Sequence, residues 1–267
     1  MNMPVLGFGT FRLQDELAYQ STLSALKLGY RHIDTAQIYG NEEQVGQAIA
    51  DSQINHNEIF VTTKVWNDNL TQLKLLDSVK QSLSKLQLDA VDLLLVHWPA
   101  APAGVEMEEY LNAMLEAKKA GLTREIGLSN FTVSQIKQAA ETISMDDIFT
   151  NQVEVHPYLQ NNTLGEFCDN AGLHITAYMP FAYGKVLKDE VIQSIAHSHQ
   201  ATPAQVVLAW LRQKNMTTIP SSTNEQNMQA NMQSLWLTLN EAEIQAIAKL
   251  DCGDRQATPD FSPQWDE

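Results

Sequence analysis

Short apolar runs alternate along the chain with longer segments of helical spacing. The runs are rich in β-branched and aromatic residues, as strands are. Eight of them occur, at residues 7–10, 31–34, 59–64, 91–97, 124–129, 150–155, 174–178 and 217–220. Apolar residues recur every three or four positions in residues 17–29, 71–86, 107–121 and 202–213. That spacing is typical of helices with one buried face, so the order predicts alternating strands and helices.

Residues at the ends of these helical segments support the same assignment. Thr71 precedes the second segment and is a plausible N-cap, and Thr202 with Pro203 forms an N-cap and N1 pair before the last. Gly29 and Gly121 close two segments, where glycine commonly ends a helix. The helix boundaries are therefore predicted from the residues as well as from the spacing.

The repeated order of strand and helix predicts the fold. It implies parallel strands joined by helical crossovers, and eight such units in roughly 250 residues match a (β/α)₈ TIM barrel. A doubly wound open sheet fits less well, because it usually has fewer units and an evident switch point. No linker or low-complexity segment divides the sequence. We predict an α/β protein with a single barrel domain over residues 1–267.

The charge and cysteine content narrow the possible partners and the location. The chain has 17 basic and 32 acidic residues, a formal net charge of −15 at pH 7. Such a charge repels phosphate backbones and anionic membrane surfaces, so we expect no nucleic acid and no membrane as partner. Cys168 and Cys252 form no CxxC pattern, and the N-terminus resembles no signal peptide. These features indicate a soluble cytoplasmic protein.

Polar and titratable residues gather where the predicted strands end. They are Asp34, Lys64, His97, Ser129, Gln152 or Glu154, Tyr178 and Ser221, and Tyr39 follows Asp34 by five residues. In a TIM barrel the chemistry lies at this carboxyl end of the strands. Each residue alone has an ordinary explanation, such as a loop-capping carboxylate or a core histidine. Their joint occurrence at one face favours an active site.

Four of these residues make chemical sense together. A tyrosine is a weak acid, with a reference pKa of ~10. A nearby ammonium group would lower that pKa and make proton transfer efficient. Lys64 can supply the ammonium, Asp34 can keep it charged, and His97 can hold a carbonyl oxygen beside Tyr39. The set suits reduction of a carbonyl or oxidation of an alcohol.

A resemblance to a known family emerges from these motifs. LGFGT, GYRHIDTAQIYGNEEQVGQAI, VTTKVW, LLLVHWP, REIGLSNF, NQVEVHPY and IPSS occur in this order. The sequence resembles the aldo-keto reductases from about Met3 to Asp254, most of all the short bacterial members that reduce 2,5-diketo-D-gluconate and methylglyoxal. The resemblance implies a nicotinamide cofactor bound without a Rossmann domain, and no G-x-G-x-x-G occurs here. It also implies a small carbonyl substrate and a monomer, as many relatives are.

The resemblance assigns roles position by position. Tyr39 matches the general acid, Lys64 and Asp34 the pair that tunes it, and His97 the residue that orients the carbonyl. Predicted cofactor contacts are Gly9, Thr10, Asp34, Ser129, Asn130, Gln152, Tyr178, Ser221, Ser222, Thr223, Asn227 and Asn231, with Tyr178 stacking on the nicotinamide. Predicted substrate contacts are Phe11, Tyr39, Trp66, His97 and Trp98.

The sequence departs from the family where NADPH is distinguished from NADH. The family usually holds the 2′-phosphate with lysine and arginine in I-P-K-S-x-x-x-x-R, whereas Ser221 and Asn227 stand here. Either neutral groups of residues 221–224 and a helix N-terminus hold the phosphate, or NADH is accepted about as well. We expect NADPH first, with NADH as the alternative.

Several further expectations follow from the remaining segments. The tail after Asp254 is short, which suggests an open pocket for small polar carbonyls. Other functions are a non-catalytic nicotinamide-binding redox sensor or accessory subunit, and a lyase with a Schiff base on Lys64. We expect no metal site, because His197 and His199 are two apart on a helix and point to different faces.

Overall fold

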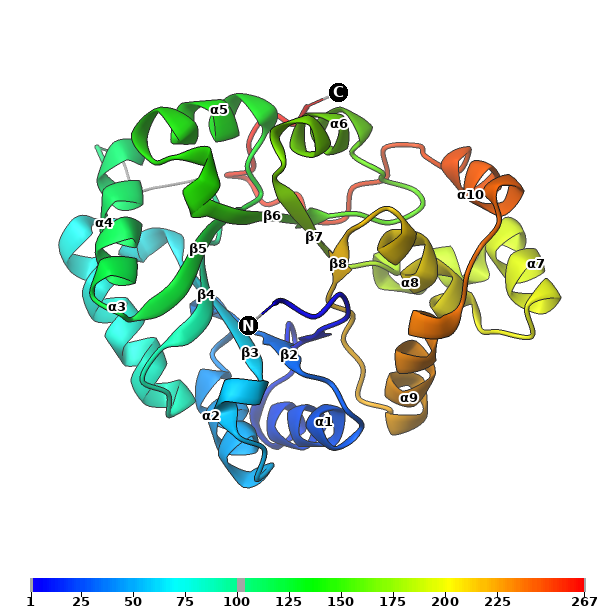
Figure 1. Ribbon diagram of the computed structural model, residues 1–267, viewed down its shortest axis with the longest axis horizontal. Helices are drawn as coiled ribbons and strands as arrows, with labels where there is room; N and C mark the ends of the chain where they lie inside the picture. The colour runs from blue at the N-terminus through cyan, green and yellow to red at the C-terminus, as the bar shows by residue number, and fades with distance from the viewer. Residues whose placement is uncertain (1, 100–103, 267) are drawn as a thin grey trace.

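The computed structural model describes residues 2–99 and 104–266 and has eight strands in one parallel sheet. The strands follow one another in sequence order around the sheet (Figure 1). They are β1 (Phe8–Gly9), β2 (His32–Asp34), β3 (Phe60–Val65), β4 (Val91–Val96), β5 (Thr123–Ser129), β6 (Ile148–Glu154), β7 (His174–Tyr178) and β8 (Thr217–Thr218). All eight predicted strands are thereby confirmed, with shorter first and last members.

Hydrogen bonds between the two ends of the sheet close it into a barrel. Leu6 and Thr218 form a parallel bridge, and the Gly9 N–H donates to Pro220 O at 3.1 Å. A Cβ atom on Gly9 would lie 2.6 Å from Ile219 O, so only glycine allows this close approach. The predicted TIM barrel is confirmed, and the closed ring excludes the doubly wound open sheet.

Helices surround the ring of strands (Figure 1). They are α1 (Asp15–Lys27), α2 (Glu42–Asp51), α3 (Gln72–Leu86), α4 (Met107–Lys119), α5 (Val133–Thr142), α6 (Asn162–Ala171), α7 (Glu190–Ser198), α8 (Pro203–Gln213), α9 (Glu225–Gln233) and α10 (Glu241–Ala248). Thr202 caps α8 in a capping box with Pro203 at the first turn, as predicted. Thr71 does precede α3, but its side chain makes no cap hydrogen bond.

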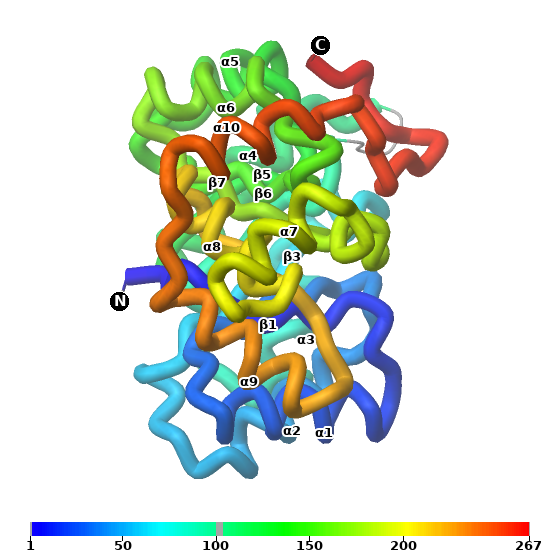
Figure 2. Tube along the Cα trace, turned by 90° about the vertical axis from the view of Figure 1, so that its right-hand side faces the viewer, coloured from blue at the N-terminus to red at the C-terminus, as the bar shows by residue number. Residues whose placement is uncertain are grey.

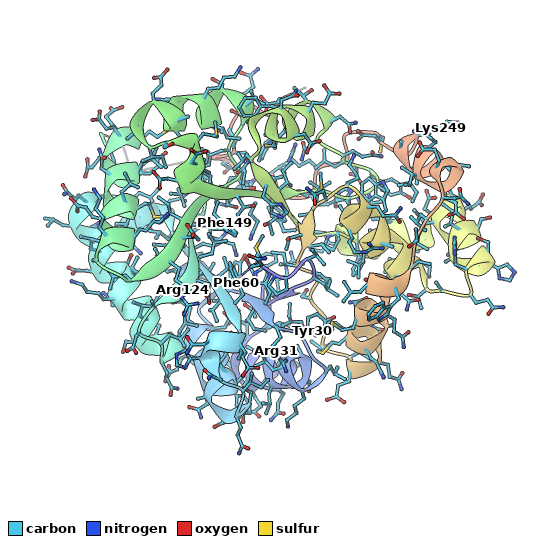
Figure 3. All side chains as sticks on the ribbon, in the orientation of Figure 1. Tyr30, Arg31, Phe60, Arg124, Phe149 and Lys249 are labelled. Carbon is cyan, nitrogen blue, oxygen red and sulfur yellow. The ribbon has the colours of Figure 1, made fainter. Side chains whose placement is uncertain are left out.

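The barrel interior is apolar at one level and polar at the next. Because side chains alternate along a strand, Phe60 and Lys64 of β3 share the inner side. Phe60 packs with Leu93 and Leu95 in a buried cluster of its own and stacks on Phe149, with ring centroids 6.1 Å apart (Figure 3). Phe60 begins β3 and Phe149 is the second residue of β6, so this cluster reaches the start of these strands, whereas Lys64 stands near the end of β3.

The two ends of the chain lie on opposite sides of the barrel (Figure 2). After α10 the C-terminal segment runs past α6 and α5 before it ends. Within residues 2–99 and 104–266, no helix is both long enough and apolar enough to cross a membrane.

Candidate active site

Lys64 and Asp34 form a buried ion pair at the carboxyl ends of β3 and β2. Lys64 Nζ lies 2.5 Å from Asp34 Oδ1 and donates to Thr35 O at 2.9 Å. Both side chains are almost completely buried. Burial lowers the pKa of Lys64, and the neighbouring Asp34 carboxylate opposes this change. The pair places an ammonium group in a site with little water.

Tyr39 lies beside this pair. It ends the short 3₁₀ helix η1 (Gln37–Tyr39), and its hydroxyl is 3.4 Å from Lys64 Nζ. Burial raises the pKa of Tyr39 well above its usual value, and Asp34 adds to this. The expectation that Lys64 lowers this pKa is therefore not met: burial dominates. The group is a protonated phenol, which can donate a proton.

His97 follows β4 directly and faces Tyr39. Their ring centroids are 5.7 Å apart with nearly perpendicular planes, and Trp66 meets His97 in the same way at 5.3 Å. Burial lowers the pKa of His97 well below its usual value, and Lys64 contributes to the decrease. The imidazole is therefore neutral at pH 7. The four predicted catalytic residues thus lie together.

The predicted nicotinamide contacts form a second cluster, on β5 to β7. Tyr178 donates its hydroxyl to Asn130 Oδ1 at 2.7 Å, and Asn130 Nδ2 donates to His97 O and to Ser129 Oγ. Gln152 Nε2 donates to Asp34 Oδ2 at 2.8 Å. This last bond connects the two clusters through the second oxygen of the same carboxylate.

Gly9 ends β1 and Thr10 follows it, and both residues form hydrogen bonds with neighbouring parts of the barrel. Gly9 is required for barrel closure, as described above. The N–H and the hydroxyl of Thr10 both donate to Asp34 O, and Thr10 is fully buried. These contacts hold the end of β1 against the end of β2.

The sequence patterns did not reveal Gln37 as part of the site. Its Oε1 accepts from the Trp66 N–H at 2.9 Å and from Asn69 Nδ2 at 3.0 Å. Its Nε2 donates to the hydroxyls of Ser78 and Ser82. Gln37 therefore connects the turn that carries Tyr39 to the segment that carries Trp66. A polar residue two positions before Tyr39 was the only sequence signal.

Phe11, Trp66 and Trp98 surround the mouth of the site. Phe11 lies 5.2 Å from the Tyr39 ring and is 43% exposed. Phe261 packs against both tryptophans. The centroid of its ring lies 5.9 Å from that of Trp66 and 5.6 Å from that of Trp98. The C-terminal tail thus reaches the predicted substrate walls, and the open pocket for small polar carbonyls stays a prediction.

The residues predicted to hold the 2′-phosphate lie between β8 and α9 and in the first turn of α9. Ser221, Thr223 and Asn227 are exposed. Ser222 Oγ already bonds with the backbone of Asn224. The Asn224 side chain caps α9 by accepting from the N–H groups of residues 226 and 227. Ser222 and Asn224 are thus engaged within the loop, whereas the side chains of Ser221, Thr223 and Asn227 make no hydrogen bond among the described residues.

Asn231, the last predicted cofactor contact, is buried in α9. Burial raises the pKa of Tyr30, and a hydrogen bond with Asn231 partly offsets this increase. The side chain therefore has a partner inside the protein. Among residues 2–99 and 104–266, no group of three His, Cys, Asp or Glu side chains is arranged to hold a metal ion.

The fold and this site define an enzyme class: a parallel barrel with a tyrosine and a buried Lys–Asp pair at its strand ends. The model of the Aldo/keto reductase family matches residues 5–251. The chain is 51% identical over its whole length, and the whole of the relative, to methylglyoxal reductase DkgB of Salmonella typhimurium. It is 48% identical to the protein of that name from Yersinia pestis, again over both full lengths.

Solved structures of similar proteins support the same family assignment. One described as a putative 2,5-diketo-D-gluconic acid reductase B superposes with a TM-score of 0.96 at 41% identity, covering 100% of this chain and 95% of that one. The aldose reductase of Schistosoma japonicum gives 0.92 at 28% identity, covering 98% and 93%. The chain belongs to the aldo/keto reductase family and is an oxidoreductase, of a family that generally uses NADP(H). The suspected family is confirmed.

Proposed function

We propose that this chain reduces small aldehydes and ketones to alcohols with NADPH, and that Tyr39 is the general acid. The observation that carries the proposal is the position of the Tyr39 hydroxyl, 3.4 Å from Lys64 Nζ and facing His97. The names of the DkgB relatives favour methylglyoxal as substrate. The structural relative favours 2,5-diketo-D-gluconate.

The protein groups supply the proton and hold the carbonyl. A bound nicotinamide would supply the hydride for the carbonyl carbon. A carbonyl oxygen held between His97 and Tyr39 would receive a proton from the Tyr39 hydroxyl as negative charge develops on it. The resulting phenolate is stabilised by the Lys64 ammonium, which Asp34 keeps charged. The buried setting strengthens this charge interaction.

The second cluster fits a carboxamide. A carboxamide has one acceptor oxygen and one donor NH₂ group. Gln152 Oε1 accepts no hydrogen bond from the described residues, and its Nε2 makes only one, to Asp34. Gln152 can therefore accept from and donate to a nicotinamide carboxamide, while the Tyr178 ring, held by Asn130, provides the stacking face.

One feature favours NADH as a second candidate cofactor. Residues 215–248 contain no lysine or arginine, and the first turn of α9 carries the carboxylate of Glu225, bonded to Ser24 Oγ at 2.6 Å. A carboxylate repels a 2′-phosphate but can accept a hydrogen bond from a ribose hydroxyl.

The test compares kcat/KM for methylglyoxal with NADPH and with NADH at one ionic strength. A preference for NADPH of on the order of a hundredfold, ~2.7 kcal/mol, supports the first candidate. Near-equal use, or a preference for NADH, supports the second. No oxidation of either cofactor with methylglyoxal, keto-sugars or simple aldehydes would refute carbonyl reduction.

A further inference from the structure

The C-terminal segment, residues 254–266, lies across the active-site mouth without helix or strand structure of its own. Phe261 meets the rings of Trp66 and Trp98, and Trp265 meets Trp98 at 6.1 Å. A segment without backbone ladder bonds needs other partners for its N–H groups. Those partners determine where Phe261 lies.

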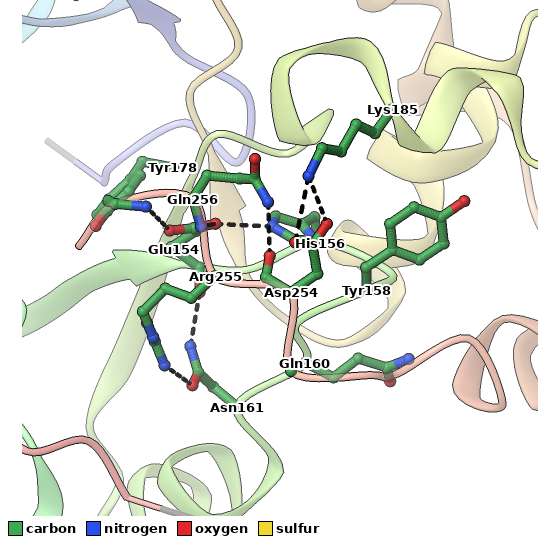
Figure 4. Close-up of polar contacts among 12 residues, drawn as sticks. Glu154, His156, Tyr158, Gln160, Asn161, Tyr178, Lys185, Asp254, Arg255 and Gln256 are labelled. Carbon is green, nitrogen blue, oxygen red and sulfur yellow. Dashed lines mark hydrogen bonds and ion pairs between the residues drawn. The ribbon is translucent and has the colours of Figure 1, made fainter.

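Glu154 provides the central partner. It is the last residue of β6 and is fully buried. Its Oε1 accepts from the Gln256 N–H and its Oε2 from the Ala257 N–H, both at 2.8 Å. His156 Nε2 lies 2.8 Å from Oε1 on the other side. Both bonds to the segment involve its backbone, so the carboxylate fixes the path of the chain (Figure 4).

Contacts of Arg255 strengthen this anchor. Its guanidinium carbon lies 3.7 Å from the centroid of the Trp265 ring, and its Nη2 donates to Asn161 Oδ1 at 2.8 Å. Asn161 in turn donates to the backbone oxygen of Glu154. Arg255 therefore links the anchored part of the segment to the aromatic part. Through Asn161 it is also linked to the end of β6 (Figure 4).

The segment is held again near its other end. Asp266 Oδ2 accepts from the Val133 N–H at 2.8 Å, at the first turn of α5. Phe261 thus lies on a stretch fixed at both sides, at residues 256–257 and at residue 266. The position of the residues between these two attachments, Phe261 among them, therefore depends on both attachments.

We propose that Glu154 is a positioning residue for the substrate, because it holds the C-terminal segment so that Phe261 completes the apolar wall of Trp66 and Trp98. Glu154 acts through the segment and not on the reacting atoms. The inference rests on the proposed carbonyl reduction. It implies that carbonyls with an apolar or aromatic group beside the C=O depend on Glu154 more strongly than methylglyoxal does.

The kinetic test uses Glu154→Gln, Phe261→Ala, the double variant and Glu166→Gln. Glu166 is an exposed glutamate of α6 and is the matched control. In Glu154→Gln the amide keeps one acceptor oxygen, but its NH₂ group would face one of the two backbone N–H groups, which loses its acceptor and loosens the segment. With benzaldehyde we expect KM to rise about fivefold in each single variant while kcat changes less than about twofold. The control should match the wild type.

The double variant separates positioning from general loosening. If Glu154 acts through Phe261, adding Phe261→Ala to Glu154→Gln raises KM no further. If the two substitutions multiply each other's effect on KM in the double variant, the proposal is overturned. A fall in kcat with unchanged KM would also overturn it. Phe261 is 42% exposed, so Phe261→Ala should fold and keep the test decisive if Glu154→Gln does not.

Trypsin provides a readout that does not depend on activity. Cleavage after Arg255 requires the segment to leave its anchor, so Glu154→Gln should be cut there at least about tenfold faster than the wild type and Glu166→Gln. Equal cleavage rates would overturn the anchor. If the wild type reduces no carbonyl, the proposed function and the substrate role both fail, and faster cleavage would then show an anchor of structural importance only.

Discussion

The side-chain oxygen of Gln37 accepts a hydrogen bond from the backbone N–H of Trp66, 2.9 Å away. Through this bond the turn that carries Tyr39 and the segment that forms a wall of the mouth keep a fixed separation. The Gln37 amide group then reaches the Ser78 and Ser82 hydroxyls on α3. Three segments of the protein thus meet at one side chain.

Gln37→Ala should disturb substrate binding more than chemistry. It removes the acceptor for Trp66 and Asn69, and each lost hydrogen bond is worth about 1 kcal/mol. We expect KM for methylglyoxal to rise about fivefold with little change in cofactor Kd. Gln37→Glu keeps the acceptor and should come closer to the wild type. Equal KM values for the wild type and Gln37→Ala would contradict a positioning role.

Tyr39→Phe should bind cofactor normally and lose nearly all carbonyl reduction. General acid catalysis contributes about 10² to 10⁴-fold, so kcat should fall within that range while the Kd for NADPH stays the same. Stopped-flow turnover and fluorescence titration measure the two quantities. A Tyr39→Phe enzyme with near wild-type kcat would remove Tyr39 from its proposed role.

Lys64→Met should reduce stability as well as activity. It leaves the buried Asp34 carboxylate without its partner, and breaking a buried pair costs about 3–5 kcal/mol. The double variant Lys64→Met with Asp34→Asn removes both charges and should recover much of the free energy of unfolding. Urea denaturation compares the three proteins. If the double variant is less stable than Lys64→Met, the pair is not the origin of the loss.

His32 should make the protein less stable in mild acid. Burial lowers its pKa from 6.5 to about 4 in the folded state, while the unfolded state retains the ordinary pKa. The unfolded state therefore binds the proton first as the pH falls. Stability is full above about pH 6.5 and decreases by about 3 kcal/mol down to pH 4.

The contribution of His32 can be isolated by substitution. His32→Gln should flatten the dependence of the free energy of unfolding on pH over this range. Burial also lowers the pKa values of His97 and His174, so part of the slope should remain. His56, which is exposed, is the control position: His56→Gln should leave the slope unchanged. An unchanged slope in His32→Gln would contradict the assignment.

A change of charge at Glu225, in the first turn of α9, should change the affinity for NADPH. Glu225→Arg replaces an exposed carboxylate in the first turn of α9 with a guanidinium, which can pair with a phosphate. We expect the Kd for NADPH to fall about tenfold and the Kd for NADH to change little. Glu225→Gln should give a smaller change of the same sign. Parallel changes for both cofactors would show that the loop does not contact the 2′-phosphate.

Much of the fold could be predicted because its signals are local. Each strand is a short β-rich run, and the reactive residues Asp34, Lys64 and His97 stand at or beside the ends of these runs. Once the barrel is assumed, sequence position alone brings those ends to one face. The proximity of the four predicted catalytic residues follows from this rule and is observed.

The contacts that sequence reasoning missed have no periodic signal. The Glu154 bond to Gln256 joins residues 102 apart in the chain, and the Gln37 bonds reach across 29 to 45 residues. The pKa of Tyr39 was also mispredicted, because burial depends on the packed structure and not on the neighbouring charge alone. Length could not show that a short tail is anchored beside the mouth.

The carboxylate of Asp34 has one oxygen on Lys64 and the other on Gln152. The proposed proton donor belongs to the first half of the barrel, β2 to β4, and the proposed nicotinamide contacts to the second, β5 to β7. A fragment containing only β2 to β4 would keep the proposed proton donor and lose the proposed nicotinamide contacts. A fragment containing only β5 to β7 would keep those contacts and lose the proton donor. Asp34 therefore joins the two halves at one side chain, alongside the hydrogen bond from Asn130 Nδ2 to His97 O.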